Sequence, residues 1–190
     1  MLASRSPRRL ELARGEGWEV RVVAPPEEAE ASAPPRRQGE PLESYVLRLA
    51  RVKAEAVMAM GISGTILACD TLSEVDGAAL GQPVDETDAR RMLEALSGRT
   101  HRVLTGVCLW QRPEAEAPLL ATAESTLAMD VLTEEFLDWY LASGMWRGKA
   151  GACGFQDERL PLRLIAGSPS NVVGLPLELI HKMLFEKEDP

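Results

Sequence analysis

The 190-residue sequence predicts an α/β or α+β domain with a mixed sheet. Segments whose apolar residues recur at helical spacing alternate with short apolar runs rich in β-branched residues. Some of these runs are joined directly by tight-turn signals, which indicates hairpins as well as crossovers. The composition, 45% hydrophobic and 26% charged, is that of a globular chain able to bury one core.

The first predicted helix opens at Ser6-Pro7 and runs to about Arg14. Ser is a favoured N-cap, and Pro is suited to the first helical position. Residues 24–41 contain five prolines among many Glu, Ala and Arg residues and predict a mobile loop. A second helix is predicted from about Leu42 to Met60, because its apolar side chains repeat at helical spacing.

A short buried strand is predicted at 65–69, ending at Asp70. The run Val75-Asp76-Gly77-Ala78 then carries a hairpin signal. A helix from about Glu86 to Leu96 ends at Ser97-Gly98, where Gly is a natural C-terminal cap.

The rest of the chain alternates in the same way. Thr133 caps a helix whose first turn carries two glutamates, favourable to the helix dipole. We expect strands at 102–110, 119–129 and 160–165, and helices at 133–143 and 176–185.

The charge balance excludes several classes of protein. With 21 Lys and Arg against 29 Asp and Glu, the net charge is −8, and no basic stripe offsets it, so we expect no broad nucleic-acid or membrane binding. No apolar run approaches the roughly 18–20 residues that span a bilayer. Three widely spaced cysteines without a CxxC pair, and no signal-peptide pattern, predict a reduced, cytoplasmic protein.

Several catalytic motifs are absent. The sequence contains no Walker loop, GxGxxG or GxSxG, and no His-rich metal spacing. Only His101 and His181 are available as imidazole bases, and nothing pairs either of them with a nucleophile. The sequence therefore disfavours standard nucleophilic catalysis.

The segment Ser4-Arg5-Ser6-Pro7-Arg8-Arg9 brings hydroxyls and arginines to the start of a helix. Arginines in a first turn oppose the helix dipole, whereas a phosphate bound there would reverse the penalty. The alternative is a simple N-cap with solvated arginines.

Two further polar residues allow more than one interpretation. Lys53 lies on the apolar face of its helix, where it either extends its ammonium to water or faces an anionic ligand. Asp70 follows a buried strand, so it is either a turn residue or a carboxylate placed for metal or water chemistry.

The segment 148–156 is rich in glycine, which allows close approach of the backbone to a ligand. Within it, Gln156 offers a hydrogen-bond donor and an acceptor to the edge of a base. The alternative is a flexible loop without a ligand.

Taken in order, these motifs resemble the Maf family of nucleoside triphosphate pyrophosphatases. The likeness rests on Leu2-Ala3-Ser4-x-Ser6-Pro7-Arg8-Arg9, Tyr45 to Ala54, Asp70-Thr71, Leu96 to His101, Thr105-Gly106, Lys149-Ala150-Gly151, Phe155-Gln156 and Asn171 to Pro176. It covers nearly the whole chain. The resemblance implies one domain over 1–190 with an elongated, twisted mixed sheet flanked by helices, two lobes and a central cleft, similar to inosine triphosphate pyrophosphatases.

The resemblance also implies a reaction. Members cleave a nucleoside triphosphate between its α- and β-phosphates with Mg²⁺ or Mn²⁺, and phosphoryl transfer depends mostly on positioning and charge stabilisation. Asp70 is implied as the catalytic carboxylate, as base or through the metal, and Glu27 as a second acidic residue and metal ligand. Lys53 would neutralise phosphate, and Ser4 and Arg9 would grip it.

Three positions imply the branch that acts on dTTP and UTP: Arg8, Thr71 and Gln156. Lys149 and the position of Gln82 are implied to contact substrate, although the family usually has Lys where Gln82 stands. Further departures from the family pattern are Cys69, Gly148 where an Asp usually precedes the lysine, Cys153, and Asp157 where Gly is usual.

We therefore predict a cytoplasmic hydrolase of nucleotide metabolism that converts dTTP and UTP to the monophosphate and pyrophosphate. Modified pyrimidine nucleotides are further candidate substrates. The alternative is a nucleotide-binding regulator of cell division whose hydrolysis is impaired by Gln82. In both interpretations the partner of the protein is a nucleoside triphosphate. Members of the family are often homodimers.

Overall fold

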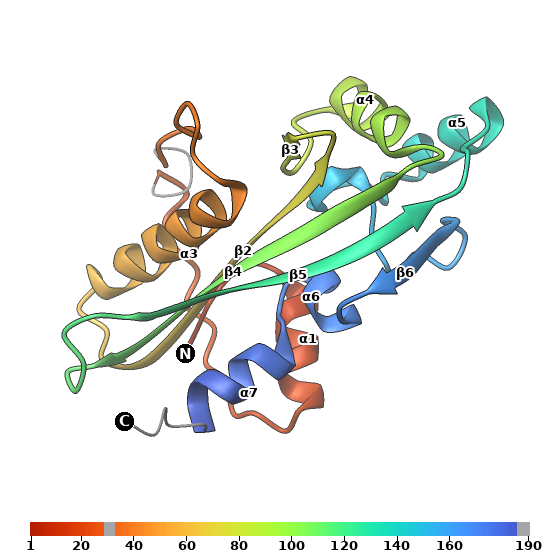
Figure 1. Ribbon diagram of the computed structural model, residues 1–190. Coiled ribbons are helices and arrows are strands. Elements are labelled where there is room, and N and C mark those ends of the chain that lie inside the picture. Colours follow the sequence, from red (N-terminus) through yellow and green to blue (C-terminus); the bar gives the residue numbers. More distant parts are fainter. Residues whose placement is uncertain (29–32, 186–190) are drawn as a thin grey trace. The chain divides into compact units, whose positions relative to one another are not determined.

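The fold is that of a mixed α/β protein. The computed structural model describes residues 1–28 and 33–185 (Figure 1). Its six-stranded sheet has the order β1-β2-β4-β5-β6, with β3 paired to β2. Strand β1 is parallel to β2, whereas β3 is antiparallel to β2 and β6 is antiparallel to β5, so the predicted mixed sheet is confirmed. The strands are β1 Leu2–Ala3, β2 Gly64–Val75, β3 Ala78–Leu80, β4 Thr100–Arg112, β5 Leu119–Met129 and β6 Leu162–Ala166.

The helices follow the predicted pattern closely. Each predicted helix is present, with ends that differ by at most two residues from the expectation. The short helix α6 was not predicted, and β1 is only two residues long. The helices are α1 Pro7–Gly15, α3 Leu42–Met58, α4 Glu86–Leu96, α5 Glu134–Ser143, α6 Pro169–Val173 and α7 Leu177–Phe185, with a 3₁₀ turn at Ala150–Ala152.

Local chemistry explains where several elements begin and turn. The Asp85 side chain accepts a hydrogen bond from the Asp88 N–H, and the Thr133 side chain accepts one from the Phe136 N–H, so both act as N-caps. Between β2 and β3, Asp76 and Gly77 both have positive φ, at 51° and 80°, as a two-residue hairpin turn requires. Ser6 occupies the N-cap position of α1 but forms no side-chain capping bond.

The chain divides into two compact units. The first comprises Met1–Asp70, Thr105–Ala123 and Gly174–Pro190, and the second comprises Thr71–Leu104 and Glu124–Val173. The division falls between Asp70 and Thr71 within β2, and β4 and β5 also contribute residues to both units. The single domain with two lobes and a central cleft stays a prediction.

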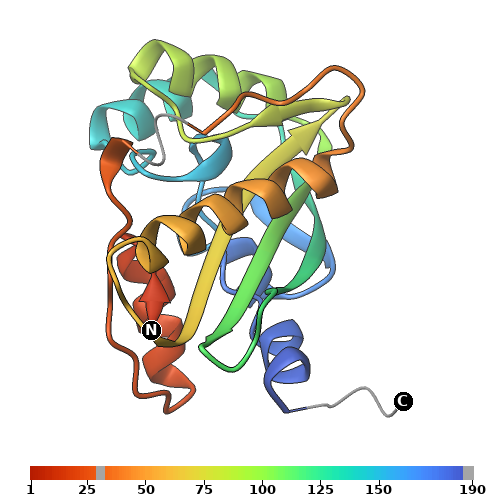
Figure 2. The same ribbon diagram turned by 90° about the vertical axis from the view of Figure 1, so that its left-hand side faces the viewer.

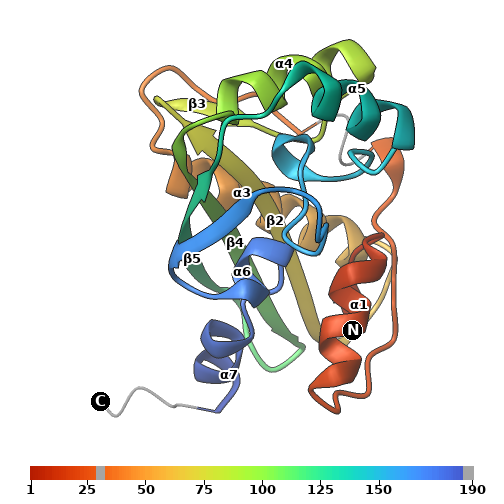
Figure 3. The same cartoon turned by 90° about the vertical axis from the view of Figure 1, so that its right-hand side faces the viewer.

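Both faces of the sheet in the first unit are covered by helices. Successive residues of a strand point to opposite faces. Ile66 and Ala68 of β2 pack in one cluster with the apolar side of α3, which crosses the strands in Figure 2. Leu67 and Cys69 pack on the other face with residues of α1 and α7, seen in Figure 3. This alternation decides on which face each polar residue of β2 lies.

The core of the second unit is built by α4 and α5. Leu93 and Leu96 of α4 pack with Leu137 and Leu141 of α5, and all four side chains are almost fully buried. Trp146 belongs to the same cluster, and its indole N–H donates to the Leu141 carbonyl oxygen at 3.0 Å. The chain that follows α5 is thereby fixed against this core.

One strand prediction was wrong. The strand expected to end at Asp70 continues as β2 to Val75, so Asp70 lies inside a strand and not beyond its carboxyl end. The extension contains the polar residues Ser73 and Glu74, so a prediction based on a run of apolar residues ended the strand too early. It is stabilised by pairing with β3, in which Ser73 lies opposite Leu80.

The loop expected at 24–41 is described only in part. Residues 29–32 lie outside the described residues, and residues 34–40 have an irregular backbone with a turn. None of the helices in the described ranges is both long enough and apolar enough to cross a membrane.

Candidate functional site

The first unit pairs two of the predicted catalytic residues directly. The Lys53 ammonium on α3 lies 2.6 Å from Oδ1 of Asp70 on β2, and the side chains are 16% and 14% exposed. Asp70 shares the α3 face with Ile66 and Ala68 because strand side chains alternate. Lys53 therefore does not extend to bulk water. It faces a carboxylate, and an anionic ligand reaching Lys53 would meet the Asp70 carboxylate as well.

Arg9 holds the backbone next to Asp70. Its Nε donates to the Gly174 carbonyl oxygen and its Nη1 to the Cys69 carbonyl oxygen, both at 2.7 Å, and the residue is only 8% exposed. Arg9 therefore links α1, the strand residue preceding Asp70 and the chain entering α7. The interpretation of Arg9 as a solvated arginine is wrong.

Ser4 lies at the same edge. Leu2 and Ala3 of β1 pair with Leu67 and Ala68 of β2, so Ser4 follows β1 beside the strand residues leading to Asp70. The Ser4 side chain is 4% exposed, and its Oγ accepts a hydrogen bond from the Ser6 N–H at 3.1 Å. Ser4 thus shapes the start of α1 by turning the chain from strand to helix.

Glu27 is held by an arginine that the sequence analysis did not select. Arg5 Nη1 donates to Glu27 Oε1 at 2.9 Å, and Arg5 Nη2 donates to the Pro25 carbonyl oxygen at 2.7 Å. Glu27 is 82% exposed on its side chain. Arg8, the neighbouring candidate on α1, is half-buried. Arg5 belongs to the same arginine-rich segment, which was the available signal for it.

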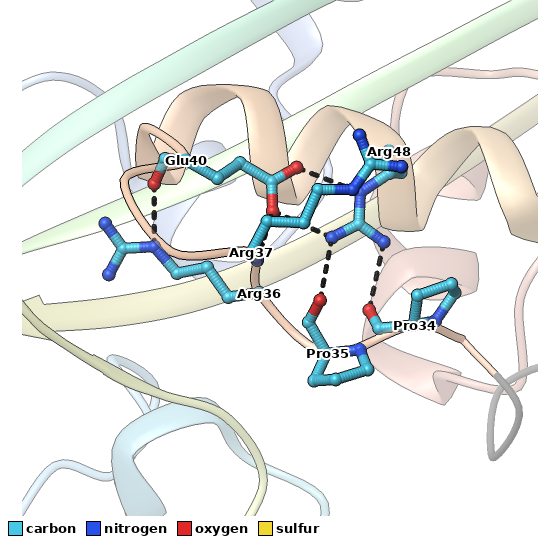
Figure 4. Close-up of polar contacts among 6 residues, drawn as sticks. All are labelled: Pro34, Pro35, Arg36, Arg37, Glu40 and Arg48. Atoms are coloured by element: carbon cyan, nitrogen blue, oxygen red, sulfur yellow. Dashed lines mark hydrogen bonds and ion pairs between the residues drawn. The ribbon is translucent and has the colours of Figure 1, made fainter.

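A second arginine holds the segment 34–40 (Figure 4). Arg48 on α3 binds both carboxylate oxygens of Glu40, at 2.9 and 2.8 Å, and donates to the carbonyl oxygens of Pro34 and Pro35. The Arg37 N–H also donates to Glu40. The Arg48 guanidinium lowers the pKa of the Glu40 carboxyl to about 2. We call Arg48 and Glu40 the loop clasp.

The four remaining candidates lie in the second unit. Thr71 is half-buried on β2, Gln82 is exposed just after β3, and Gln156 is exposed in the segment 149–157, which we call the Lys149 loop. Lys149 itself is largely buried and lies 2.5 Å from both carboxylate oxygens of Asp157.

Backbone contacts join three of these elements. The Gly151 N–H donates to the Gly81 carbonyl oxygen at 2.9 Å, so the residue before Gln82 touches the Lys149 loop. Ser73, two residues after Thr71 on the same side of β2, lies with its Oγ 3.4 Å from the Ala150 carbonyl oxygen. The Lys149 loop therefore packs against both β2 and the end of β3.

Two glycines of the Lys149 loop lie close to side chains of this same chain. A Cβ at Gly151, where φ is +68°, would lie 2.9 Å from Ser73 Oγ, and a Cβ at Gly154 would lie 2.9 Å from Lys149 Nζ. The expected close approach to a ligand stays a prediction, since these two approaches are intramolecular.

The thiols are poor nucleophiles. Burial raises the pKa of Cys69 to about 11 and that of Cys108 and Cys153 to about 12, so all three stay protonated near neutral pH. This agrees with the sequence argument against nucleophilic catalysis.

The fold and these contacts define a mixed α/β protein in which Lys53 pairs with Asp70 and Arg9 binds the backbone of the preceding residue, a chemistry suited to phosphorylated ligands. Comparisons with known proteins identify the family. Residues 1–187 match the family described as Maf-like protein. The chain belongs to the Maf-like family, which confirms the resemblance found in the sequence.

Curated relatives match over nearly the whole chain. The dTTP/UTP pyrophosphatase of Anaeromyxobacter sp. (strain Fw109-5) is 44% identical and is matched over 100% of this chain and 90% of its own. That of Rhodopirellula baltica is 42% identical, with 97% and 80% covered, and that of Porphyromonas gingivalis is 39% identical, with 97% and 92% covered. A solved HAM1 protein from Coxiella burnetii aligns with a TM-score of 0.44 at 19% identity, over 67% of this chain and 71% of that chain.

Proposed function

We propose that this protein hydrolyses dTTP and UTP to the nucleoside monophosphate and pyrophosphate. The names of its relatives, which match nearly end to end at about 40% identity, support this activity. The structural observation that carries it is the Lys53–Asp70 pair, since a shielded carboxylate beside a lysine suits a reaction in which charge on phosphate must be stabilised.

Each residue around Asp70 has a distinct proposed role. Lys53 contacts Oδ1 of Asp70, which leaves Oδ2 to orient the attacking water or to bind a cation. When a triphosphate enters, the Lys53 ammonium shifts part of its interaction to phosphate oxygens. Arg9 keeps the backbone of Asp70 in place through the Cys69 carbonyl, and Ser4 and Arg9 are proposed to bind phosphate at the start of α1.

The donor set fits Mg²⁺ or Mn²⁺ brought in with the nucleotide. Among the described residues no group of three His, Cys, Asp or Glu side chains converges to form a protein-built cage. Hard divalent cations in phosphate enzymes commonly take one or two carboxylates, here Asp70 and Glu27, together with phosphate oxygens. Such an ion would neutralise charge that develops on the bridging oxygen.

We propose that Arg8, Thr71 and Gln156 contribute to recognition of the pyrimidine nucleotide. The Gln156 carboxamide carries both a donor and an acceptor, matching the mixed pattern of a thymine or uracil edge, and it is exposed. Gln82 and Lys149 were expected to contact substrate. We propose this contact for Gln82. We also propose a cytoplasmic location, from the cysteine spacing and the N-terminal sequence, and a homodimer, as the family resemblance implies.

The decisive experiment measures pyrophosphate release from dTTP, UTP, CTP, GTP and 7-methyl-GTP with Mg²⁺ or Mn²⁺. We expect release from dTTP and UTP, and its loss in Asp70→Asn with folding retained. Release confined to 7-methyl-GTP would keep the reaction but overturn the base assignment. If the protein binds nucleotides but releases pyrophosphate from none of them, the result would favour the alternative function, a nucleotide-binding regulator of cell division.

A further inference from the structure

Three largely buried side chains, Lys149, Asp157 and Tyr140, tie the Lys149 loop to α5. Lys149 Nζ lies 2.5 Å from both Oδ1 and Oδ2 of Asp157, and the Tyr140 hydroxyl donates to Oδ2 at 2.5 Å. Lys149 and Asp157 are each 11% exposed, and Tyr140 is fully buried. The cation that the sequence assigned to substrate is therefore already bound by a carboxylate of the protein.

The loop is closed around the Lys149 stem. A Cβ at Gly154 would lie 2.9 Å from Cδ, Cε and Nζ of Lys149, so a side chain there would have to displace the lysine stem. The Asp157 N–H donates to the Gly154 carbonyl oxygen at 3.0 Å, and the Ala152 N–H donates to the Lys149 carbonyl oxygen at 3.1 Å. Lys149 is thus packed along its length and not only at its charge.

Electrostatics favour keeping this arrangement intact. Removing one partner of a buried pair leaves an uncompensated charge, which is strongly destabilising. Burial, together with the hydrogen bond to Asp157, raises the pKa of Tyr140, so the hydroxyl remains a donor. Moving the Lys149 ammonium to a phosphate would remove the cation from Asp157 and leave its carboxylate with the Tyr140 hydroxyl.

We infer that Lys149 is a positioning residue: with Asp157 and Tyr140 it fixes the loop that presents Gln156, and so sets selectivity for the pyrimidine base. Gln156 immediately precedes Asp157 and is exposed, so its backbone is fixed while its carboxamide stays accessible. The inference rests on the proposed function, in which Gln156 recognises the base.

The experiment is a double-mutant cycle read out as base selectivity. Lys149→Met, Asp157→Asn, the double variant and Tyr140→Phe are assayed for kcat/KM on dTTP and on dCTP, with thermal unfolding measured in parallel. The control pair is Arg163→Met and Asp130→Asn, because that ion pair is also in the second unit but is more than 60% exposed on both sides. The control is expected to leave activity and selectivity unchanged.

If Lys149 acts through Asp157, each single substitution lowers the dTTP-over-dCTP ratio of kcat/KM about tenfold, and the double variant is no worse than the poorer single. Tyr140→Phe lowers the same ratio by about threefold, since only one hydroxyl is lost. Loss of stability alone would reduce the active fraction for both nucleotides equally, so the ratio separates positioning from a merely structural role.

Direct phosphate binding by Lys149 gives a different pattern. Lys149→Met would then lower kcat/KM equally for both nucleotides, and Asp157→Asn would preserve or increase activity by releasing the lysine. That pattern, or strictly additive losses, overturns the inference. If the charged variants do not fold, Tyr140→Phe decides: an unchanged ratio in a folded protein overturns the inference.

The wild-type assay separates this inference from the proposed function. Without pyrophosphate release from dTTP by the unmodified protein, the proposed function itself fails. If the wild type releases pyrophosphate and prefers dTTP, but every variant keeps the same dTTP-over-dCTP ratio of kcat/KM, the proposed function stands and only the role of Lys149 is wrong.

Discussion

Arg9 Nη1 donates to the carbonyl oxygen of Cys69 at 2.7 Å, and Cys69 is the residue immediately before Asp70. The same guanidinium binds the Gly174 carbonyl oxygen, so one buried side chain joins three segments that are far apart in sequence. Lysine carries the charge but lacks the fork that reaches two acceptors in different directions.

Arg9→Lys should therefore lower both stability and activity. We expect a decrease of about 2–3 kcal/mol in the free energy of unfolding, because one charge-assisted bond is lost in a buried place. Urea unfolding and pyrophosphate release measure the two effects. Arg14→Lys, on the exposed last turn of the same helix, is the control. Equal behaviour of the two variants would contradict a linking role for Arg9.

Gly106 permits α3 to approach β4 at backbone distance. A Cβ there would lie 2.5 Å from the Val46 carbonyl oxygen and 2.8 Å from the Leu47 nitrogen. Backbone atoms cannot rotate away, so Gly106→Ala should destabilise the protein by about 3 kcal/mol or more. Gly15→Ala is the matched control, since its Cβ meets nothing within 4 Å on a helical turn; it should be neutral or stabilising by up to about 1 kcal/mol. Chemical denaturation of both variants tests the contact.

His101 makes stability depend on pH. Burial lowers its pKa from 6.5 to about 4, outweighing the nearby Glu74 carboxylate, which acts in the opposite direction. Between these two values the unfolded chain binds more protons, so the free energy of unfolding is retained above pH 6.5 and falls as pH drops toward 4. The decrease should reach at most about 3 kcal/mol.

Denaturation at several pH values between 4 and 7 measures this dependence. His101→Leu should flatten the slope over this window, because it removes the buried imidazole whose pKa is lowered. An identical slope in wild type and His101→Leu would assign the pH dependence to other groups.

Short-range signals predicted most of the helices and turns. Thr133 and the Asp76-Gly77 turn act through neighbours only a few residues away, so the sequence contains their whole cause. The extension of β2 depends instead on distant partners. Glu74 is 8% exposed and is paired with Arg102 at 2.7 Å, and no local pattern reveals that a glutamate will be buried there.

The candidate site divides along the same line. Helical spacing placed Lys53 on the face of α3 that meets the sheet, but only strand alternation and packing show that it meets Asp70. The partner of Lys149 could not be deduced, because Asp157 lies eight residues away in a loop without periodicity. The sequence motifs therefore identify candidate residues such as Lys149, whereas partners such as Asp157 are identified only by the structure.

The loop clasp should protect the chain near Arg36 and Arg37 from trypsin. Both arginines are exposed cleavage sites, and Arg48 holds the adjoining backbone through Pro34, Pro35 and Glu40. Arg48→Lys removes the two-pronged contact and should accelerate cleavage there several-fold, because local opening becomes more frequent. Arg51→Lys is the control, since its pair with Glu55 is exposed. Unchanged cleavage in Arg48→Lys would show that the clasp does not limit opening of this loop.

Gln82→Lys tests whether the missing cation limits turnover. The family resemblance implies a phosphate contact at this position, and Gln82 is exposed directly after β3. A new ammonium there should raise kcat/KM for dTTP about tenfold, the value of one charge-assisted contact of about 1.5 kcal/mol. The gain should weaken as salt concentration rises. Val84→Lys places the same charge two residues away, on a side chain that is 86% exposed, and should have little effect. A similar gain in both variants would indicate general attraction of the substrate by positive charge, whereas no gain in Gln82→Lys would mean that glutamine is not what limits the reaction.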